Sequence, residues 1–150
     1  MANKTQSFDK RINAEDTAED YFKDYCIKEE IKFYDYGIKD HEFGNKFYKV
    51  KRIIRNTPDY IVMSNDTCLV EVKGCWNNIS LKEGDLNSYK VWNKYMRLYY
   101  FFYSVYHKEH IWITHNDLLN VIPLCETDYH NDPNPYDDKM YYKILWSMIK

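Results

Sequence analysis

Apolar residues recur along this chain first at helical spacing and later in short runs that are typical of β-strands. The spacing predicts an amphipathic helix over residues 13–27, with Asn13 as its N-cap. A second helix is predicted over residues 85–96, with Asp85 as its cap. The apolar face is formed by Ala18, Phe22, Tyr25 and Cys26 in the first helix and by Leu86, Tyr89, Trp92 and Met96 in the second.

Runs of β-branched and aromatic residues between turn-forming residues predict a set of short strands. They cover residues 31–36, 59–63, 68–73, 98–106 and 111–114, and residues 76–81 are expected to be partly extended. A helical turn is expected at 116–119, loops at 39–45 and 125–138, a loose start at 1–11, and a docked apolar end at 141–149. This order predicts one α/β domain over residues 1–150.

Two neighbouring predicted strands carry the residues that point to chemistry. The first opens with Pro58-Asp59-Tyr60-Ile61-Val62, and the second contains Leu69-Val70-Glu71-Val72-Lys73. Because strand side chains alternate between faces, Glu71 and Lys73 share one face while Val70 and Val72 point to the other. Two carboxylates and an ammonium group in one place suit a hard divalent cation and an attacking water.

The surroundings of Glu71 strengthen this interpretation. A Glu-x-Lys triplet alone has little weight, since Glu30-Ile31-Lys32 also fits and lacks the preceding Pro-Asp. Glu71, however, is flanked by apolar residues, so we expect it to be buried, and a buried carboxylate needs compensation. A metal with Lys73 would provide it; a buried Glu71–Lys73 pair without a metal is the alternative.

On these residues the chain resembles the PD-(D/E)XK nucleases, a superfamily that cuts nucleic-acid phosphodiesters. The resemblance implies a restriction-endonuclease-like fold, in which helices flank a central mixed β-sheet, over residues 13–120; residues 121–150 form a C-terminal extension without a counterpart. It implies that Asp59, Glu71 and the Val72 carbonyl bind Mg²⁺, for which Mn²⁺ can substitute. Lys73 would then position or deprotonate the attacking water, the latter with a depressed pKa.

The resemblance also implies an acid from the first helix and a polar residue from the helix after the motif. Glu15-x-x-Ala18-x-x-x-Phe22 is similar to the opening helix of resolvase-type members, and Glu15 lies nearer the apolar stripe than Glu19. Both acids could equally be solvated surface residues. Lys90 is the candidate on the second helix, with a solvent-facing lysine as the alternative, and Tyr89 is interpreted as core.

The shared site depends on the pairing of strands 59–63 and 68–73. A one-residue slip in a hairpin moves every side chain to the other face. We predict a three-residue turn at 65–67, with Asp59 opposite Lys73 and Ile61 opposite Glu71. A regular hairpin with a two- or four-residue turn would point Asp59 away from Glu71.

Charge is distributed unevenly along the chain. The net charge is −2, but residues 46–98 carry ten basic and five acidic side chains and the regions on either side are acidic. Within this part a basic stretch without acids, defined by Lys46, Lys49, Lys51, Arg52 and Arg55, is interleaved with Phe47 and Tyr48. We expect it to bind phosphates and bases, and a lysine-protected strand edge is the alternative.

Together these features predict a Mg²⁺-dependent DNA nuclease, an endonuclease or a junction-resolving enzyme. A catalytically inactive nucleic-acid-binding protein of the same fold and an RNA-directed nuclease are the alternatives. No apolar run is long enough to span a bilayer and the first twenty residues are highly charged, so we expect a cytoplasmic protein without a membrane partner. High aromatic content suggests a homodimer.

Overall fold

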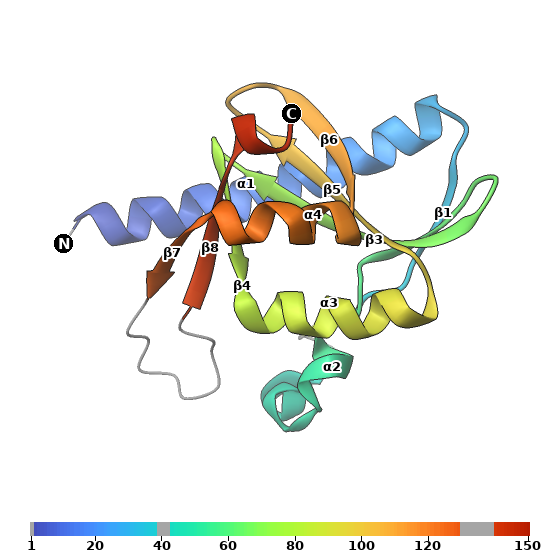
Figure 1. The fold of residues 1–150 in the computed structure, drawn as a ribbon, viewed down its shortest axis with the longest axis horizontal. Coiled ribbons are helices and arrows are strands. Elements are labelled where there is room, and N and C mark those ends of the chain that lie inside the picture. The colour runs from blue at the N-terminus through green and yellow to red at the C-terminus, as the bar shows by residue number, and fades with distance from the viewer. Residues whose placement is uncertain (1, 39–42, 130–139) are drawn as a thin grey trace.

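The computed structural model describes residues 2–38, 43–129 and 140–150 and has a mixed five-stranded sheet at its centre (Figure 1). The sheet has the strand order β1-β2-β3-β5-β6, in which only β3 and β5 run parallel. Its strands are β1 (Lys32–Asp35), β2 (Tyr60–Met63), β3 (Thr67–Cys75), β5 (Leu98–Ser104) and β6 (Glu109–Thr114). The predicted α/β fold with a central mixed sheet is therefore confirmed.

Helix α1 (Ala2–Lys28) covers one face of this sheet. Its buried residues recur every four positions and pack against β2, β3 and β5, namely Ala14, Ala18, Phe22 and Cys26. The predicted N-cap at Asn13 is wrong, because the helix begins at Ala2 and the Asn13 carbonyl accepts a hydrogen bond from Thr17 inside it. Polar residues before Asn13 hid this start, since they break the apolar period without breaking the helix.

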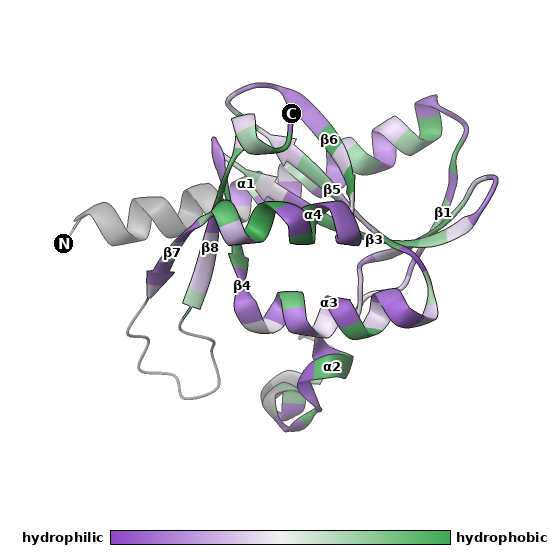
Figure 2. Ribbon diagram, viewed as in Figure 1, coloured by the Kyte–Doolittle hydropathy of each residue, from purple (hydrophilic) through white to green (hydrophobic). Residues whose placement is uncertain are grey.

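Helices α3 (Glu83–Tyr95) and α4 (His115–Val121) cover the opposite face. Leu86 and Tyr89 of α3 and Leu118 of α4 join Leu69 and Tyr100 in the second part of the core. Figure 2 shows hydrophilic colour over much of α3, in keeping with a helix that buries one side only. The predicted cap at Asp85 is also wrong, because α3 begins at Glu83 and Asp85 lies in its first turn.

A second, antiparallel sheet packs beside the first and has the order β4-β8-β7. It joins β4 (Asn78–Lys82) to the C-terminal strands β7 (Glu126–Tyr129) and β8 (Met140–Leu145), and the 3-10 helix η4 (Trp146–Met148) follows. Ile144 and Trp146 are buried, which confirms the docked end. The loop prediction is wrong for residues 126–129, and residues 130–138 lie outside the described part.

The remaining short elements connect these layers. They are the 3-10 helices η2 (Gly44–Lys49) and η3 (Ile122–Leu124) and the one-turn helix α2 (Arg52–Arg55), which lies beside α3. In the part of the chain that the structure describes, no helix combines the length and apolarity needed to cross a membrane.

Candidate active site

Asp59 lies immediately before β2, where backbone contacts from the segment after β1 hold it in position. The preceding Pro58 is fully buried. The Asp59 carbonyl accepts hydrogen bonds from the amides of Tyr36 (2.8 Å) and Gly37 (3.0 Å), which follow β1. A Cβ atom at Gly37 would lie 3.1 Å from the Asp59 Cα, so this close approach favours glycine. The end of β1 therefore supports the start of the motif.

The β2–β3 hairpin brings Asp59 to the face that holds Glu71 and Lys73. Tyr60 pairs with Val70 and Met63 with Thr67, so the turn contains the three residues between 63 and 67. Continuing this register by one residue places Asp59 opposite Glu71, where Cβ atoms lie about 5 Å apart. The predicted partner, Lys73, is wrong by two residues. The predicted face is correct, because a two-residue shift preserves it.

The Asp59 carboxylate is half-buried and turned toward β3. Its Oδ2 accepts a hydrogen bond of 2.9 Å from the Val72 amide. Burial raises the pKa of Asp59 well above its usual value, and the nearby Glu71 charge raises it further, against the opposing effects of Lys73 and the Val72 amide. Two carboxylates that repel each other therefore lie close together, and both need positive charge or hydrogen-bond donors nearby.

Glu71 is almost completely buried, with 3% of the residue exposed, and only one of its oxygens is satisfied. Its Oε1 accepts a hydrogen bond of 2.6 Å from the Tyr89 hydroxyl and lies 3.0 Å from the Lys73 Nζ. Its Oε2 is buried and has no hydrogen-bond partner among the described residues. A simple buried Glu71–Lys73 pair accounts for Oε1 but leaves Oε2 and Asp59 unexplained.

Lys73 reaches from this buried pair to the surface, with 23% of its side chain exposed. Burial lowers its pKa, but the charges of Glu71, Asp85, Asp59 and Glu15 outweigh burial and raise the pKa above its usual value. The protein's own charges therefore raise the pKa of Lys73, and a depressed pKa beside a bound metal stays a prediction. A protonated Lys73 suits positioning of a water or phosphate better than removal of a proton.

The exposed end of Lys73 lines a cavity of about 420 Å³. Glu15 from α1 and Asp85 from α3 line the same cavity. The structure thus brings Glu15 and Lys73 together, although Glu15 is exposed. Glu19 is more buried and accepts a 3.4 Å hydrogen bond from the Tyr60 hydroxyl, so the helix presents both acids near the motif.

Asp85 and Tyr89 are site residues that the sequence reasoning missed. Asp85 accepts a 3.0 Å hydrogen bond from the Asn56 side chain and lies 3.9 Å from the Arg52 guanidinium. Tyr89, interpreted as core, is buried but holds Glu71 through its hydroxyl. Their four-residue spacing places both on one side of α3, which is the signal that was available in the sequence.

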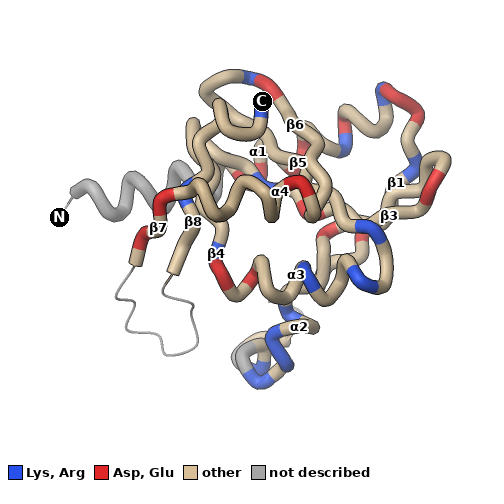
Figure 3. Tube along the Cα trace, in the orientation of Figure 1, with Lys and Arg blue, Asp and Glu red and all other residues tan. Residues whose placement is uncertain are grey.

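The basic stretch folds into η2 and α2 beside α3, and Figure 3 shows its blue positions gathered around α2. The strand-edge alternative is wrong, because residues 44–49 and 52–55 are helical. Lys46, Lys49 and Lys51 are exposed, whereas Arg52 approaches Asp85 and Arg55 lies over the Phe47 ring at 5.7 Å. The side chain of Tyr48 lies outside the described part, and Lys90 is exposed on α3.

The site offers few oxygen ligands from side chains. Across residues 2–38, 43–129 and 140–150, no three His, Cys, Asp or Glu side chains converge as a metal-binding group. Two carboxylates and a backbone carbonyl fit Mg²⁺, which commonly takes one or two carboxylates and completes its shell with water and phosphate. The Glu71 Oε2, which lacks a partner among the residues that the structure describes, is consistent with such a ligand.

Comparison with solved structures gives a distant likeness. No protein-family model matches the chain, and no curated protein matches it. A solved structure described as D212, a nuclease from a fusselovirus, aligns with a TM-score of 0.49 and 12% identity over 95% of this chain and 84% of that one. At this level of similarity, function has to be argued from the residues of the site.

Proposed function

We propose that this protein is a divalent-metal-dependent nuclease of the PD-(D/E)XK type that hydrolyses DNA phosphodiesters, as an endonuclease or a junction-resolving enzyme. The observation that carries the proposal is the Oε2 of Glu71, which is buried near the Asp59 carboxylate and has no hydrogen-bond partner in the described part of the chain. A buried anionic oxygen without a partner is costly, and a cation bound by both acids would remove that cost.

The chain has residues for each role that such a reaction requires. Asp59 and Glu71 supply the negative charge that binds Mg²⁺ or Mn²⁺. The Val72 amide bonds to Asp59, and its carbonyl points to the same edge of β3, so this carbonyl adds a neutral oxygen. A bound divalent metal supplies an acidified water and neutralises charge on the phosphoryl oxygens. Lys73 remains protonated and orients water or phosphate from the cavity side.

The test of this proposal is a cleavage assay on supercoiled plasmid, branched DNA and RNA, each with Mg²⁺ and with EDTA. Metal-dependent cutting of DNA by the wild type, lost in Asp59→Asn, is the expected result. Asn keeps the oxygen that accepts from the Val72 amide, so the fold is retained. Cutting of RNA alone would establish the RNA-directed alternative, and nucleic-acid binding without cutting would establish the inactive one.

Metal binding provides an independent measurement. In calorimetry, Mn²⁺ is expected to bind the wild type weakly and to lose its affinity for Asp59→Asn/Glu71→Gln. Because the raised pKa of Asp59 favours its protonated form, the metal must displace a proton, and affinity should increase as pH rises. Equal binding by wild type and double variant would contradict the ligand assignment.

Tyr89→Phe is expected to lower Mn²⁺ affinity or cleavage about tenfold, because partners that hold a metal ligand contribute about that much. The variant keeps the ring packed against Tyr100 and removes only the hydroxyl bonded to Glu71. Calorimetry and cleavage kinetics measure the effect, and Tyr95→Phe, an exposed position on the same helix, is the matched control. If metal affinity and cleavage rate do not change, Tyr89 contributes only to the core.

The exposed lysines of the basic stretch are expected to bind the nucleic-acid backbone. Reversing Lys46, Lys49 and Lys51 to Glu should weaken binding whatever the base sequence, and each lost phosphate contact should remove about 0.9 from the log–log salt slope on duplex DNA. Arg52 and Arg55 are left intact because they contact Asp85 and Phe47.

The matched control reverses Lys28, Lys32 and Lys108 to Glu. These three lysines are exposed and lie outside the basic stretch. Binding titrations at several salt concentrations compare the two triple variants. Equal affinity and slope in both would move the binding surface to Lys82, Lys90, Lys94 and Arg97.

A homodimer also stays a prediction. Light scattering at assay concentrations measures the mass of the particle and so tests it.

A further inference from the structure

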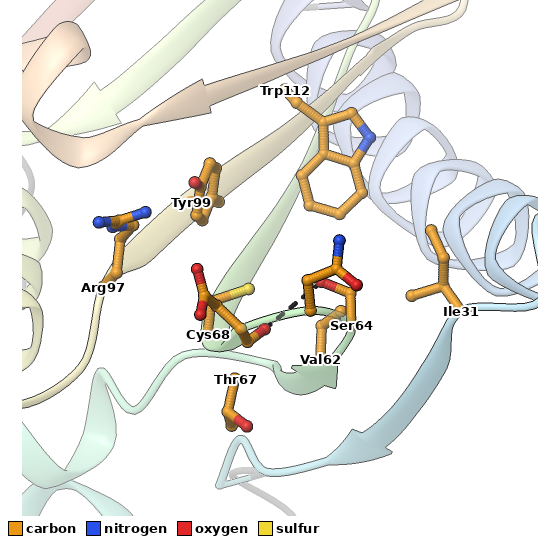
Figure 4. Close-up of a pocket in the computed structure, with 10 residues that line it drawn as sticks. Ile31, Val62, Ser64, Thr67, Cys68, Arg97, Tyr99 and Trp112 are labelled. Atoms are coloured by element: carbon orange, nitrogen blue, oxygen red, sulfur yellow. Dashed lines mark hydrogen bonds between the residues drawn. The ribbon is translucent and has the colours of Figure 1, made fainter.

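A second cavity, of about 540 Å³, lies away from the candidate active site, at the turn between β2 and β3 (Figure 4). Its lining includes Val62 and Cys68, which belong to the part of the core under α1. Glu71 and Lys73 instead share their strand face with Leu69, which belongs to the core under α3. The two sites are therefore on opposite faces of the sheet, and this volume is ordinary for a small-ligand site.

The walls of this cavity combine aromatic rings with an apolar floor. Tyr99 and Trp112 are half-buried, and their ring centroids lie 6.3 Å apart at an interplanar angle of 78°. A planar ligand can stack on one ring and meet the edge of the other. Ile31, Val62 and Cys68 form the apolar part of the lining. Such a surface favours a flat, partly apolar group.

The rim adds hydrogen-bonding groups and one cation. Asn65 offers a donor and an acceptor, and Asp66 offers acceptors for an amino group. The Arg97 side chain is exposed at the cavity, while its backbone carbonyl is fixed by a 2.9 Å hydrogen bond from the Leu69 amide. A guanidinium group in this position can bind phosphate in a bidentate manner.

From this arrangement we infer that the cavity binds a nucleobase that carries a phosphate, with the base on Tyr99 and Trp112 and the phosphate at Arg97. The ligand is either a free mononucleotide or the unpaired end of a nucleic-acid strand. Acceptors at Asp66 favour bases that have an exocyclic amino group over uracil or thymine. This site does not require the proposed nuclease activity, because its lining includes none of Asp59, Glu71 and Lys73.

Amide NMR of the full-length protein tests the inference with AMP, CMP, UMP and the corresponding nucleosides. The indole signal of Trp112 and the amides of residues 64–67 should shift, while the indoles of Trp76, Trp92 and Trp146 serve as internal references. AMP and CMP should bind more tightly than UMP, and removal of the phosphate should weaken binding about tenfold. A 5′-phosphorylated single strand and a blunt duplex form a second pair of probes.

Two variants with matched controls decide the outcome. Arg97→Gln and Tyr99→Leu should each weaken binding about tenfold, and the exposed neighbours Lys94→Gln and Tyr95→Leu should not. Shifts with the single strand but not with mononucleotides would identify a strand end as the ligand. An absence of shifts with either, or equal binding by Arg97→Gln and wild type, would overturn the inference. Asp59→Asn should bind as the wild type does, which keeps this result separate from the nuclease test.

Discussion

Replacing Lys73 with alanine is expected to lower the rate of DNA cleavage about a thousandfold, while nucleic-acid affinity changes only a few-fold. The ammonium group lies 3.0 Å from Glu71 Oε1 and faces the cavity shared with Glu15 and Asp85. In the proposed reaction it acts on one water or phosphate, whereas nucleic-acid binding would depend on many backbone contacts. Single-turnover cleavage and equilibrium binding, measured on the same substrate, separate the two effects.

The chain supplies a matched control for this prediction. Lys32 ends the triplet Glu30-Ile31-Lys32, is exposed on β1, and has no Pro-Asp before it, so Lys32→Ala should cut normally. Because Lys73→Ala removes one partner of a buried Glu71, it can cost about 3 kcal/mol of stability. Lys73→Gln keeps a hydrogen-bond donor and serves as the second variant. If both variants fold and cut DNA at the wild-type rate, the activity belongs to another site.

The sequence was sufficient to predict which face of the hairpin carries the site, and insufficient to predict the register. Alternation along β3 places Glu71 and Lys73 together whatever the pairing is. The partner of Asp59 depends on where the turn begins, and Ser64-Asn65-Asp66-Thr67 offers turn-forming residues at several positions. A shift of two residues preserves the face, so Asp59 and Glu71 share a face although the predicted register was wrong.

Contacts between distant segments account for what the sequence reasoning missed. From the sequence, Asp85 was interpreted as a helix cap and Tyr89 as a core residue. The packing of α3 against β3 and β5 brings Asp85 near Lys73 and Tyr89 to Glu71. The second sheet pairs β4 with β8 across more than fifty residues, and no local pattern predicts such a pairing. In the basic stretch, a strand edge protected by lysines was the alternative interpretation, and the chain forms short helices there instead.

Gly74 follows Lys73 on β3 and lies where α1 crosses the strand most closely. A Cβ atom built there would be 1.9 Å from the Ala14 carbonyl oxygen and 2.8 Å from the Glu15 amide nitrogen. Both are backbone atoms, so no side-chain rotation can relieve the contact. The absence of a side chain at Gly74 therefore allows α1 to sit against the strand and to carry Glu15 to the cavity that Lys73 lines.

Gly74→Ala is accordingly expected to lower the free energy of unfolding by about 3 kcal/mol or more, because overpacking at a rigid contact forces the backbone apart. That is a large part of the stability of a typical domain, which is about 5–15 kcal/mol. Denaturant unfolding measures the loss. Adding Ala14→Gly should give no rescue, since the clash is with the Ala14 carbonyl and not with its methyl group.

The same substitution connects stability to the site. Moving α1 away from β3 would withdraw Glu15 from Lys73, so the folded fraction of Gly74→Ala should also cleave more slowly than the wild type. Glu15→Gln, which leaves the helix in place, separates the loss of the carboxylate from the loss of helix position. If Gly74→Ala unfolds within about 0.5 kcal/mol of the wild type, α1 does not rest on β3 at this residue. In that case the assignment of Glu15 to the cavity fails with it.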